Sequence, residues 1–94
     1  MNTLFLKNGC LVEFDGVLKS HIILNDLHIC LLEHQRSMTD KIVSLNERGE
    51  LLWVKERNHP SILRREGDFL VLEGDSLERV NPYSGELDLR ELTD

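Results

Sequence analysis

The chain has 94 residues, a formal net charge of −6 and a hydrophobic fraction of 40%, which fit one small domain and exclude a disordered chain. The acidic balance argues against a general nucleic-acid binder, and no apolar run is long enough to cross a bilayer. The sequence shows no signal peptide, which would have a basic start followed by an apolar stretch. We therefore expect a cytoplasmic protein that binds neither membranes nor nucleic acid directly. Alanine, the best helix former, is absent beside abundant Leu, Val and Ile, which favours strands.

Apolar segments and turn residues alternate along the first third of the chain. They predict strands at residues 3–7, 10–14, 17–24 and 27–33, separated by turns at Asn8-Gly9, Asp15-Gly16 and Asn25-Asp26. In the fourth strand, Leu27, Ile29 and Leu31 fall on one face, and His28, Cys30 and Leu32 fall on the other. A helix over residues 17–33 partly fits a 3.6-residue period, but the β-branched residues and the Asn25-Asp26 turn disfavour it.

The rest of the chain continues the same pattern. Residues 34–40 are polar and are predicted to form a loop. Strands at 42–45 and 51–54 flank a turn at residues 46–49. Residues 57–66 are predicted to be the longest irregular stretch, with at most a short strand at 61–63. Strands at 69–72, 77–80 and 87–89 close the chain, which gives nine or ten short strands in all.

Three hairpins share one form, in which an apolar strand, an Asn, a turn ending in Gly and a second apolar strand follow one another. Their glycines, Gly9, Gly49 and Gly85, lie 40 and 36 residues apart, and a period near 40 is typical of β-propeller blades. The second and third units resemble the blades of quinoprotein (PQQ-type) propellers. Gly49-Glu50-Leu51-Leu52-Trp53 carries the Gly and the following Trp, whereas Leu89 stands where the last unit should have its aromatic residue.

This resemblance covers about residues 40–92 and implies blade-like packing without the quinoprotein activity, because a closed propeller needs at least four blades. We expect one all-β domain over residues 1–94, in which short antiparallel strands form a partial propeller-like or sandwich arrangement. It would contain two to three hairpin repeats, at about 1–33, 38–57 and 62–92. An incomplete ring leaves unpaired strand edges that a partner or a second copy could cover.

Candidate catalytic or metal-binding chemistry is sparse. His28 and Cys30 would share a strand face about 7 Å apart, with His21 and His34 nearby, but a zinc site needs four ligands and no Cys-x-x-Cys pair occurs. Ordinary packed strand residues are therefore the favoured interpretation. Cys10 and Cys30 are expected to be free thiols in a reducing compartment. Without a phosphate-binding Gly-rich loop or a Ser-centred elbow, we expect no enzyme, no metal and no cofactor.

The negative charge is concentrated in the last third of the chain. Residues 1–65 carry eight acidic residues against nine Lys and Arg, whereas residues 66–94 carry nine against two, a net of −7. Charge complementarity speeds association, so this segment is expected to contact a basic protein surface. The candidate contact residues are five carboxylates and the aromatic residue of a turn: Glu73, Asp75, Glu78, Tyr83, Glu86 and Asp88. The alternative is that these acids are the solvated faces of ordinary strands.

Two smaller features also have alternative interpretations. Arg57, Arg64 and Arg65 are expected to pair with the acidic strands, with contact to a phosphate or carboxylate ligand as the alternative. Trp53 is expected in the core, with a role as an interface anchor as the alternative.

Small size, acidity and the lack of a catalytic motif resemble the immunity proteins of bacterial contact-dependent toxin systems, especially those that oppose nucleases. The resemblance is one of general character and transfers no residues. It implies an inhibitor that occupies the basic surface of a nuclease-type toxin domain. The alternative is a structural or assembly module, a propeller-like fragment that forms a homodimer or joins a larger complex.

Overall fold

The computed structural model describes residues 3–6, 9, 11–14, 16–34, 38–58, 60–74 and 76–87. Nine antiparallel strands form three sheets, and the described residues contain no helix. Sheet A consists of β1 (Thr3–Phe5) and β2 (Leu11–Glu13). Sheet B consists of β3 (Val17–Leu24), β4 (Leu27–His34), β5 (Thr39–Leu45) and β6 (Leu51–Asn58). Sheet C consists of β7 (Ile62–Glu66), β8 (Phe69–Glu73) and β9 (Leu77–Val80).

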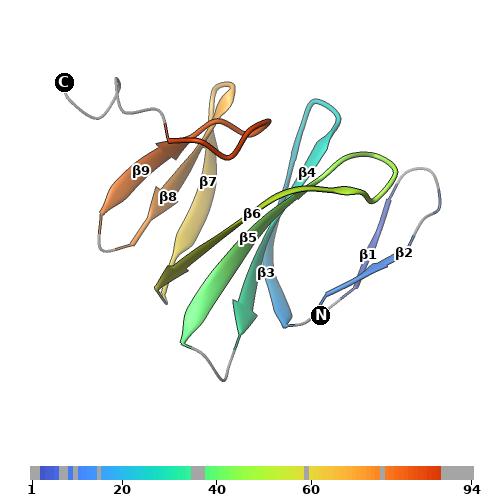
Figure 1. The fold of residues 1–94 in the computed structure, drawn as a ribbon, viewed down its shortest axis with the longest axis horizontal. Coiled ribbons are helices and arrows are strands. Elements are labelled where there is room, and N and C mark those ends of the chain that lie inside the picture. Colours follow the sequence, from blue (N-terminus) through green and yellow to red (C-terminus); the bar gives the residue numbers. More distant parts are fainter. Residues whose placement is uncertain are drawn as a thin grey trace.

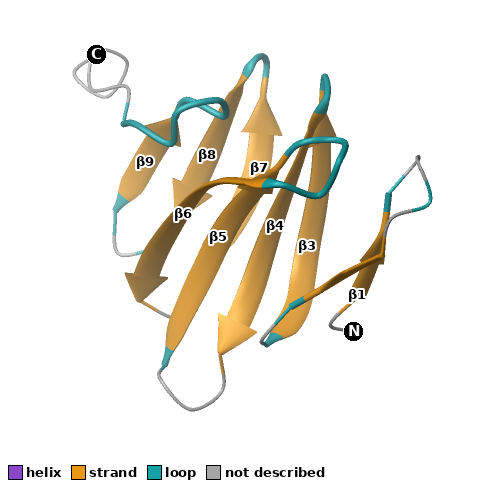
Figure 2. Cartoon of the chain, turned by 45° about the vertical axis from the view of Figure 1, so that its right-hand side comes forward, coloured by secondary structure: helices purple, strands orange, loops and turns teal. Residues whose placement is uncertain are grey.

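The three sheets follow one another along the chain and lie side by side, with sheet B in the middle (Figures 1 and 2). Within each sheet, neighbouring strands are also neighbours in sequence, and an isolated bridge between Val80 and Leu87 extends sheet C. The predicted all-β class is confirmed, and the helix considered for residues 17–33 is replaced by the β3–β4 hairpin. The part of the chain described by the structure closes into neither a barrel nor a ring.

The largest difference from the predicted elements lies at residues 57–66. The prediction of a long irregular stretch there is wrong, because β6 continues to Asn58 and β7 occupies Ile62–Glu66. Charged residues hide the apolar alternation in both strands. Arg57 and Arg64 can occupy strand positions because Glu78 and Glu73 pair with their guanidinium groups.

The core lies on both faces of β4, whose first six residues are all buried. One face packs against sheet C through Ile29, Leu31, Leu63 and Leu70, within a larger cluster that Trp53 joins from β6. The other face forms a smaller cluster made of Cys30, Leu32 and Val43, against which Leu4, Phe14 and Leu18 pack. The predicted division of residues 27–32 between two faces is confirmed. Both faces are apolar because β4 lies in the middle layer.

β6 is an edge strand of sheet B, since its only strand neighbour among the described residues is β5. Leu51 is 59% exposed, and Leu52 and Val54 are each 45% exposed along this edge. Trp53 points to the opposite face and packs against the larger core cluster, as predicted for a core residue. None of the described segments is a helix long and apolar enough to span a membrane.

Candidate functional site

The structure divides the predicted contact residues between two ends of sheet C. Glu73 and Glu78 flank the β8–β9 connection, whereas Tyr83 and Glu86 lie in the loop after β9, at the opposite end (Figure 1). The remaining two candidates, Asp75 and Asp88, lie outside the described residues. The four described candidates therefore belong to two separate surfaces.

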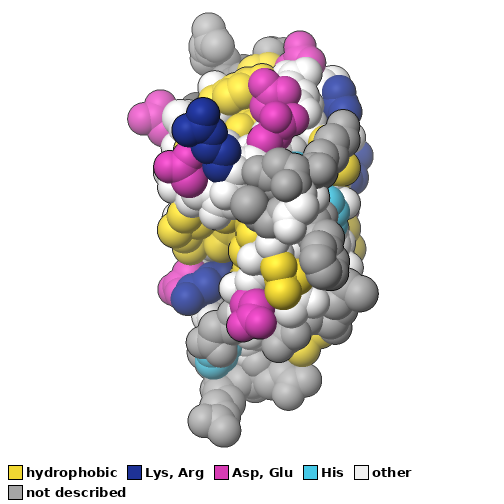
Figure 3. Space-filling view, turned by 90° about the vertical axis from the view of Figure 1, so that its right-hand side faces the viewer, with side chains coloured by type: hydrophobic (Ala, Val, Ile, Leu, Met, Phe, Trp, Pro, Cys, Tyr) yellow, Lys and Arg dark blue, Asp and Glu magenta, His cyan; other side chains and the backbone are white. Residues whose placement is uncertain are grey.

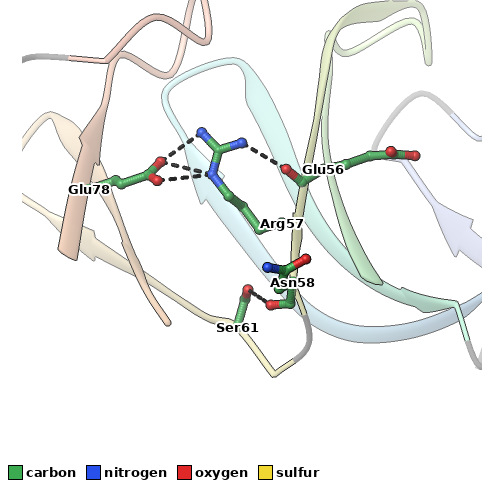
Figure 4. A network of polar contacts seen from close by, with 5 residues as sticks. All are labelled: Glu56, Arg57, Asn58, Ser61 and Glu78. Carbon is green, nitrogen blue, oxygen red and sulfur yellow. Dashed lines mark hydrogen bonds and ion pairs between the residues drawn. The ribbon is translucent and has the colours of Figure 1, made fainter. Parts of the chain in front are cut away.

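A cleft of about 190 Å³ opens between sheets B and C at the first of these ends. Arg57 reaches from β6 across the cleft to Glu78 on β9, where Nε lies 2.9 Å from Oε2 and Nη2 lies 2.7 Å from Oε2 (Figure 4). The Arg57 Nη1 also donates to the backbone oxygen of Glu56 at 2.7 Å. The Glu78 carboxylate thus binds Nε and Nη2 of the guanidinium, while the Glu56 carbonyl binds Nη1. The cleft lining is mostly polar: Arg57, Asn58, Ser61, Leu72, Glu73, Gly74, Ser76 and Glu78.

Arginines from the neutral part of the chain compensate the acids at this end. Arg64 Nη2 lies 2.6 Å from Glu73 Oε1, in addition to the Arg57–Glu78 pair. The predicted pairing of these two arginines with the acidic strands is confirmed. Arg65 instead donates to the backbone oxygens of Gly67 and Ile23. The net charge at the cleft end is consequently much less negative than that of residues 66–94, the sequence segment that supplies its acids.

A buried aspartate lies beneath the cleft and fixes the connection between sheets B and C. Asp40 is fully buried, and its Oδ2 accepts a 2.8 Å hydrogen bond from the backbone N–H of Ser61. Lys19 Nζ lies 3.5 Å from the same oxygen. Ser61 Oγ donates to the Asn58 oxygen at 3.0 Å, which completes the tie between the end of β6 and the start of β7 (Figure 4).

Three turns meet at the opposite end of the molecule, which we call the Tyr83 end. They are the β3–β4 turn, the β7–β8 turn and the loop at residues 81–87, and the β5–β6 turn lies at the same end (Figures 1 and 2). Asn25 Nδ2 donates to the Tyr83 hydroxyl oxygen at 2.6 Å and links two of these turns. Tyr83 is 55% exposed, as predicted for this aromatic residue, and Ile23 is 48% exposed. The turns also carry three exposed carboxylates: Asp26, Asp68 and Glu86.

Sequence reasoning found Tyr83 and Glu86 but missed Ile23, Asp26 and Asp68. These residues are far from residue 83 in sequence, and only the return of three turns to one end brings them together. The only sequence signal that could have found them was the turn chemistry at these positions. Asn25, for example, adopts a positive φ of 55° that suits an Asn-Asp turn.

The loop that carries Tyr83 is held by its own turn and by sheet B. Asn81 Oδ1 accepts hydrogen bonds from the backbone N–H groups of Tyr83 and Ser84. Pro82 is buried, and its carbonyl oxygen accepts a 2.7 Å hydrogen bond from Trp53 Nε1. Because the loop is ordered by these contacts, presenting Tyr83 to a partner needs little further loss of conformational entropy.

His21 and His28 form a stacked pair on the face of sheet B that points away from sheet C. Their ring centroids are 5.2 Å apart, and His21 Nε2 lies 2.9 Å from His28 Nδ1. Burial lowers the pKa of His21 below its ordinary 6.5, and the charge of His28 lowers it further. At neutral pH His21 is therefore packed against His28 as a neutral ring.

Acidification is expected to destabilise the fold through His21. Below pH 6.5 the unfolded chain binds a proton at His21 before the folded chain does, so the stability present above pH 6.5 is lost as the pH falls. The urea midpoint should drop between pH 7.5 and 5.5, and His21→Gln should flatten that dependence. An unchanged slope in the variant would contradict this role for His21.

Cys30 is fully buried, and burial raises the pKa of its thiol to about 12. The Cys30 thiol is therefore protonated at neutral pH, which disfavours a role for this residue as a nucleophile. Cys10 lies outside the described residues. Within the described ranges, no group of three or more His, Cys, Asp and Glu side chains is placed to hold a metal ion.

We expect Cys30 to resist thiol reagents in the folded protein. In a Cys10→Ser variant, which leaves one thiol, a disulfide reagent such as Ellman's should react only after denaturant is added. Rapid reaction at neutral pH without denaturant would contradict the burial of this side chain.

No protein-family model, curated protein or solved structure matches this chain. The fold and its surfaces define an all-β protein of three antiparallel sheets with a polar cleft at one end and an aromatic, acidic surface at the other.

Proposed function

We propose that the chain is a small protein-binding inhibitor, an immunity protein that neutralises a basic, nuclease-type bacterial toxin domain in the cytoplasm by occupying its surface. The observation that carries this proposal is the Tyr83 end. There an exposed aromatic ring and an exposed Ile23 accompany three exposed carboxylates from separate turns. Tyr side chains are frequent energetic anchors of interfaces, and surrounding charge selects and steers the partner.

The proposal places the partner at the Tyr83 end and not at the cleft. Glu73 and Glu78 already pair with arginines, so a basic partner would have to displace Arg64 and Arg57 to reach them. At the Tyr83 end, Asp26, Asp68 and Glu86 are exposed, and Arg65 donates to the backbone oxygens of Gly67 and Ile23. Of the two predicted contacts outside the described residues, Asp88 directly follows this loop in sequence and stays a candidate for the same partner, whereas Asp75 belongs in sequence to the β8–β9 connection and is not part of this proposal.

Co-purification with the product of the neighbouring gene, at low and high salt, tests this function. We expect binding that weakens with salt, and about a 30-fold loss of affinity on Tyr83→Ala. Asp26→Lys and Glu86→Lys should mainly slow association. The matched control is Glu13→Lys, an exposed acid at the end of β2 and away from the Tyr83 end. Binding that is indifferent to the Tyr83-end changes, or no binding of a basic neighbour, would contradict the proposal.

A second candidate function is assembly through blade-like stacking of the sheets. Two comparable contacts support it, each between the last strand of one sheet and a turn glycine of the next. A Cβ at Gly49 would lie 3.2 Å from Val12 Cγ2 of β2, and one at Gly85 would lie 2.7 Å from Trp53 Cδ2 of β6. Both glycines have positive φ, and the N–H of each closes its turn by donating to an Asn carbonyl.

This repeated contact favours successive propeller-like blades over three unrelated hairpins. Sheets A and B each supply an apolar residue that lies on the glycine of the following sheet, so a comparable contact occurs twice in one chain. Among the described residues, no further sheet follows at either end of this stack, and exposed sheet faces are normally covered by another element or another chain.

A further inference from the structure

We propose that two copies of the chain associate head to tail, so that the outer face of sheet C in one copy covers the outer face of sheet A in the other. This inference rests on the blade-like stacking proposed above, and it identifies a second copy of the chain as the molecule that covers the open sheet faces. Each copy would use both of its open faces, and six sheets would close into one ring. Six lies within the four to eight blades of known propellers, whereas three copies would give nine.

Gly9 is the observation that points to a missing neighbour. Its N–H closes the β1–β2 turn on the Leu6 oxygen at 3.0 Å and its φ is +88°, as at the other two repeat glycines. A Cβ at Gly49 or Gly85 would meet the preceding sheet, but a Cβ at Gly9 would meet nothing within 4 Å. Among the described residues, sheet A is the first sheet of this stack and no preceding sheet covers Gly9, so a second copy of the chain could supply the covering side chain.

The two open faces both expose apolar side chains. On sheet C, Leu63 and Leu72 point into the core, so the alternate residues Ile62 and Leu77 point outward, where they are 59% and 51% exposed. On sheet A, Leu11 is 49% exposed. Figure 3, which views the molecule from the β1–β2 side, shows hydrophobic surface between groups of charged side chains.

The charges on the outer face of sheet C suit a second copy better than a strongly basic partner. The outward positions carry two arginines and two glutamates: Arg64, Arg79, Glu66 and Glu73. Arg64 pairs with Glu73 at 2.6 Å, and the Arg79 guanidinium lies 4.3 Å from the Phe69 ring centroid. A face balanced in this way offers no net attraction to a cationic protein, whereas Ile62 and Leu77 offer apolar surface to Leu11 of sheet A.

Sedimentation equilibrium of the full chain over micromolar concentrations tests the proposal. We expect a species of twice 10.9 kDa, and about a 30-fold weaker dimer for Leu77→Glu and for Leu11→Glu. The control is Leu51→Glu, which changes an equally exposed leucine on the β6 edge and should leave the dimer intact. Circular dichroism checks that each variant keeps its strands.

Three outcomes overturn the head-to-tail dimer: a monomer at every concentration, a dimer that Leu51→Glu dissociates, and a dimer insensitive to both Leu77→Glu and Leu11→Glu. The stacking itself is tested separately by the coupling between Trp53 and Gly85 within one chain, described below. A monomer with strong Trp53–Gly85 coupling would leave the stacking in place and reject the dimer alone.

Discussion

Replacing Asp40 by Ala is expected to lower the free energy of unfolding by about 3 kcal/mol. The carboxylate is fully buried and accepts the N–H of Ser61, so its removal leaves a buried donor without its acceptor and also leaves a cavity. Since small domains have only about 5–15 kcal/mol in total, this is a large fraction of the stability. Urea unfolding followed by circular dichroism measures the change.

Two further substitutions identify which interaction of Asp40 carries the effect. Asp40→Asn keeps an oxygen acceptor for the Ser61 N–H and should cost less than Ala. Lys19→Met removes the ammonium, which lies 3.5 Å from the carboxylate and is partly solvent-exposed, so its cost should stay below about 1 kcal/mol. An Asp40→Ala variant as stable as the native chain would contradict the assigned role of the residue in joining sheets B and C.

Replacing Gly85 by Ala is expected to destabilise the fold by about 3 kcal/mol through two separate effects. The residue has φ of +75°, which costs a non-glycine residue about 1 kcal/mol. In addition, the new methyl group would lie 2.7 Å from Trp53 Cδ2, so the indole must shift from its hydrogen bond with the Pro82 oxygen. Urea unfolding again gives the size of the loss, and the fluorescence of the single Trp reports the shift.

Gly67→Ala is the matched control for the backbone effect alone. Gly67 has φ of +62°, and a Cβ there would meet nothing within 4 Å, so only the cost of about 1 kcal/mol should appear. In a Trp53→Leu background, Gly85→Ala should fall to the same value, because the ring that it meets has gone. Equal costs for Gly85→Ala in both backgrounds would show that sheet B does not pack on this glycine.

Much of the local structure could be predicted from the sequence because strand alternation and turn chemistry are short-range properties. The bounds of Val17–Leu24 and Leu77–Val80 agree with the structure, as do the turns at Asn25-Asp26 and Asn46–Gly49. Residues 57–66 could not be predicted in this way. The charges that interrupt their apolar pattern are paired with Glu78 and Glu73, which arrive from later strands.

By itself, the sequence determined the all-β class, the repeated Gly turns and the concentration of charge in the last 29 residues. Only the tertiary structure decided where that charge acts. Pairing with Arg64 of the neighbouring strand and with Arg57 of sheet B neutralises Glu73 and Glu78 at the cleft, and the meeting of three turns gathers Tyr83 with Asp26, which is 57 residues earlier in the chain. Turn and strand signals depend on neighbouring residues, whereas a surface depends on how the sheets stack. Sheet stacking is set by the packing of Trp53, Gly85 and the two clusters on β4.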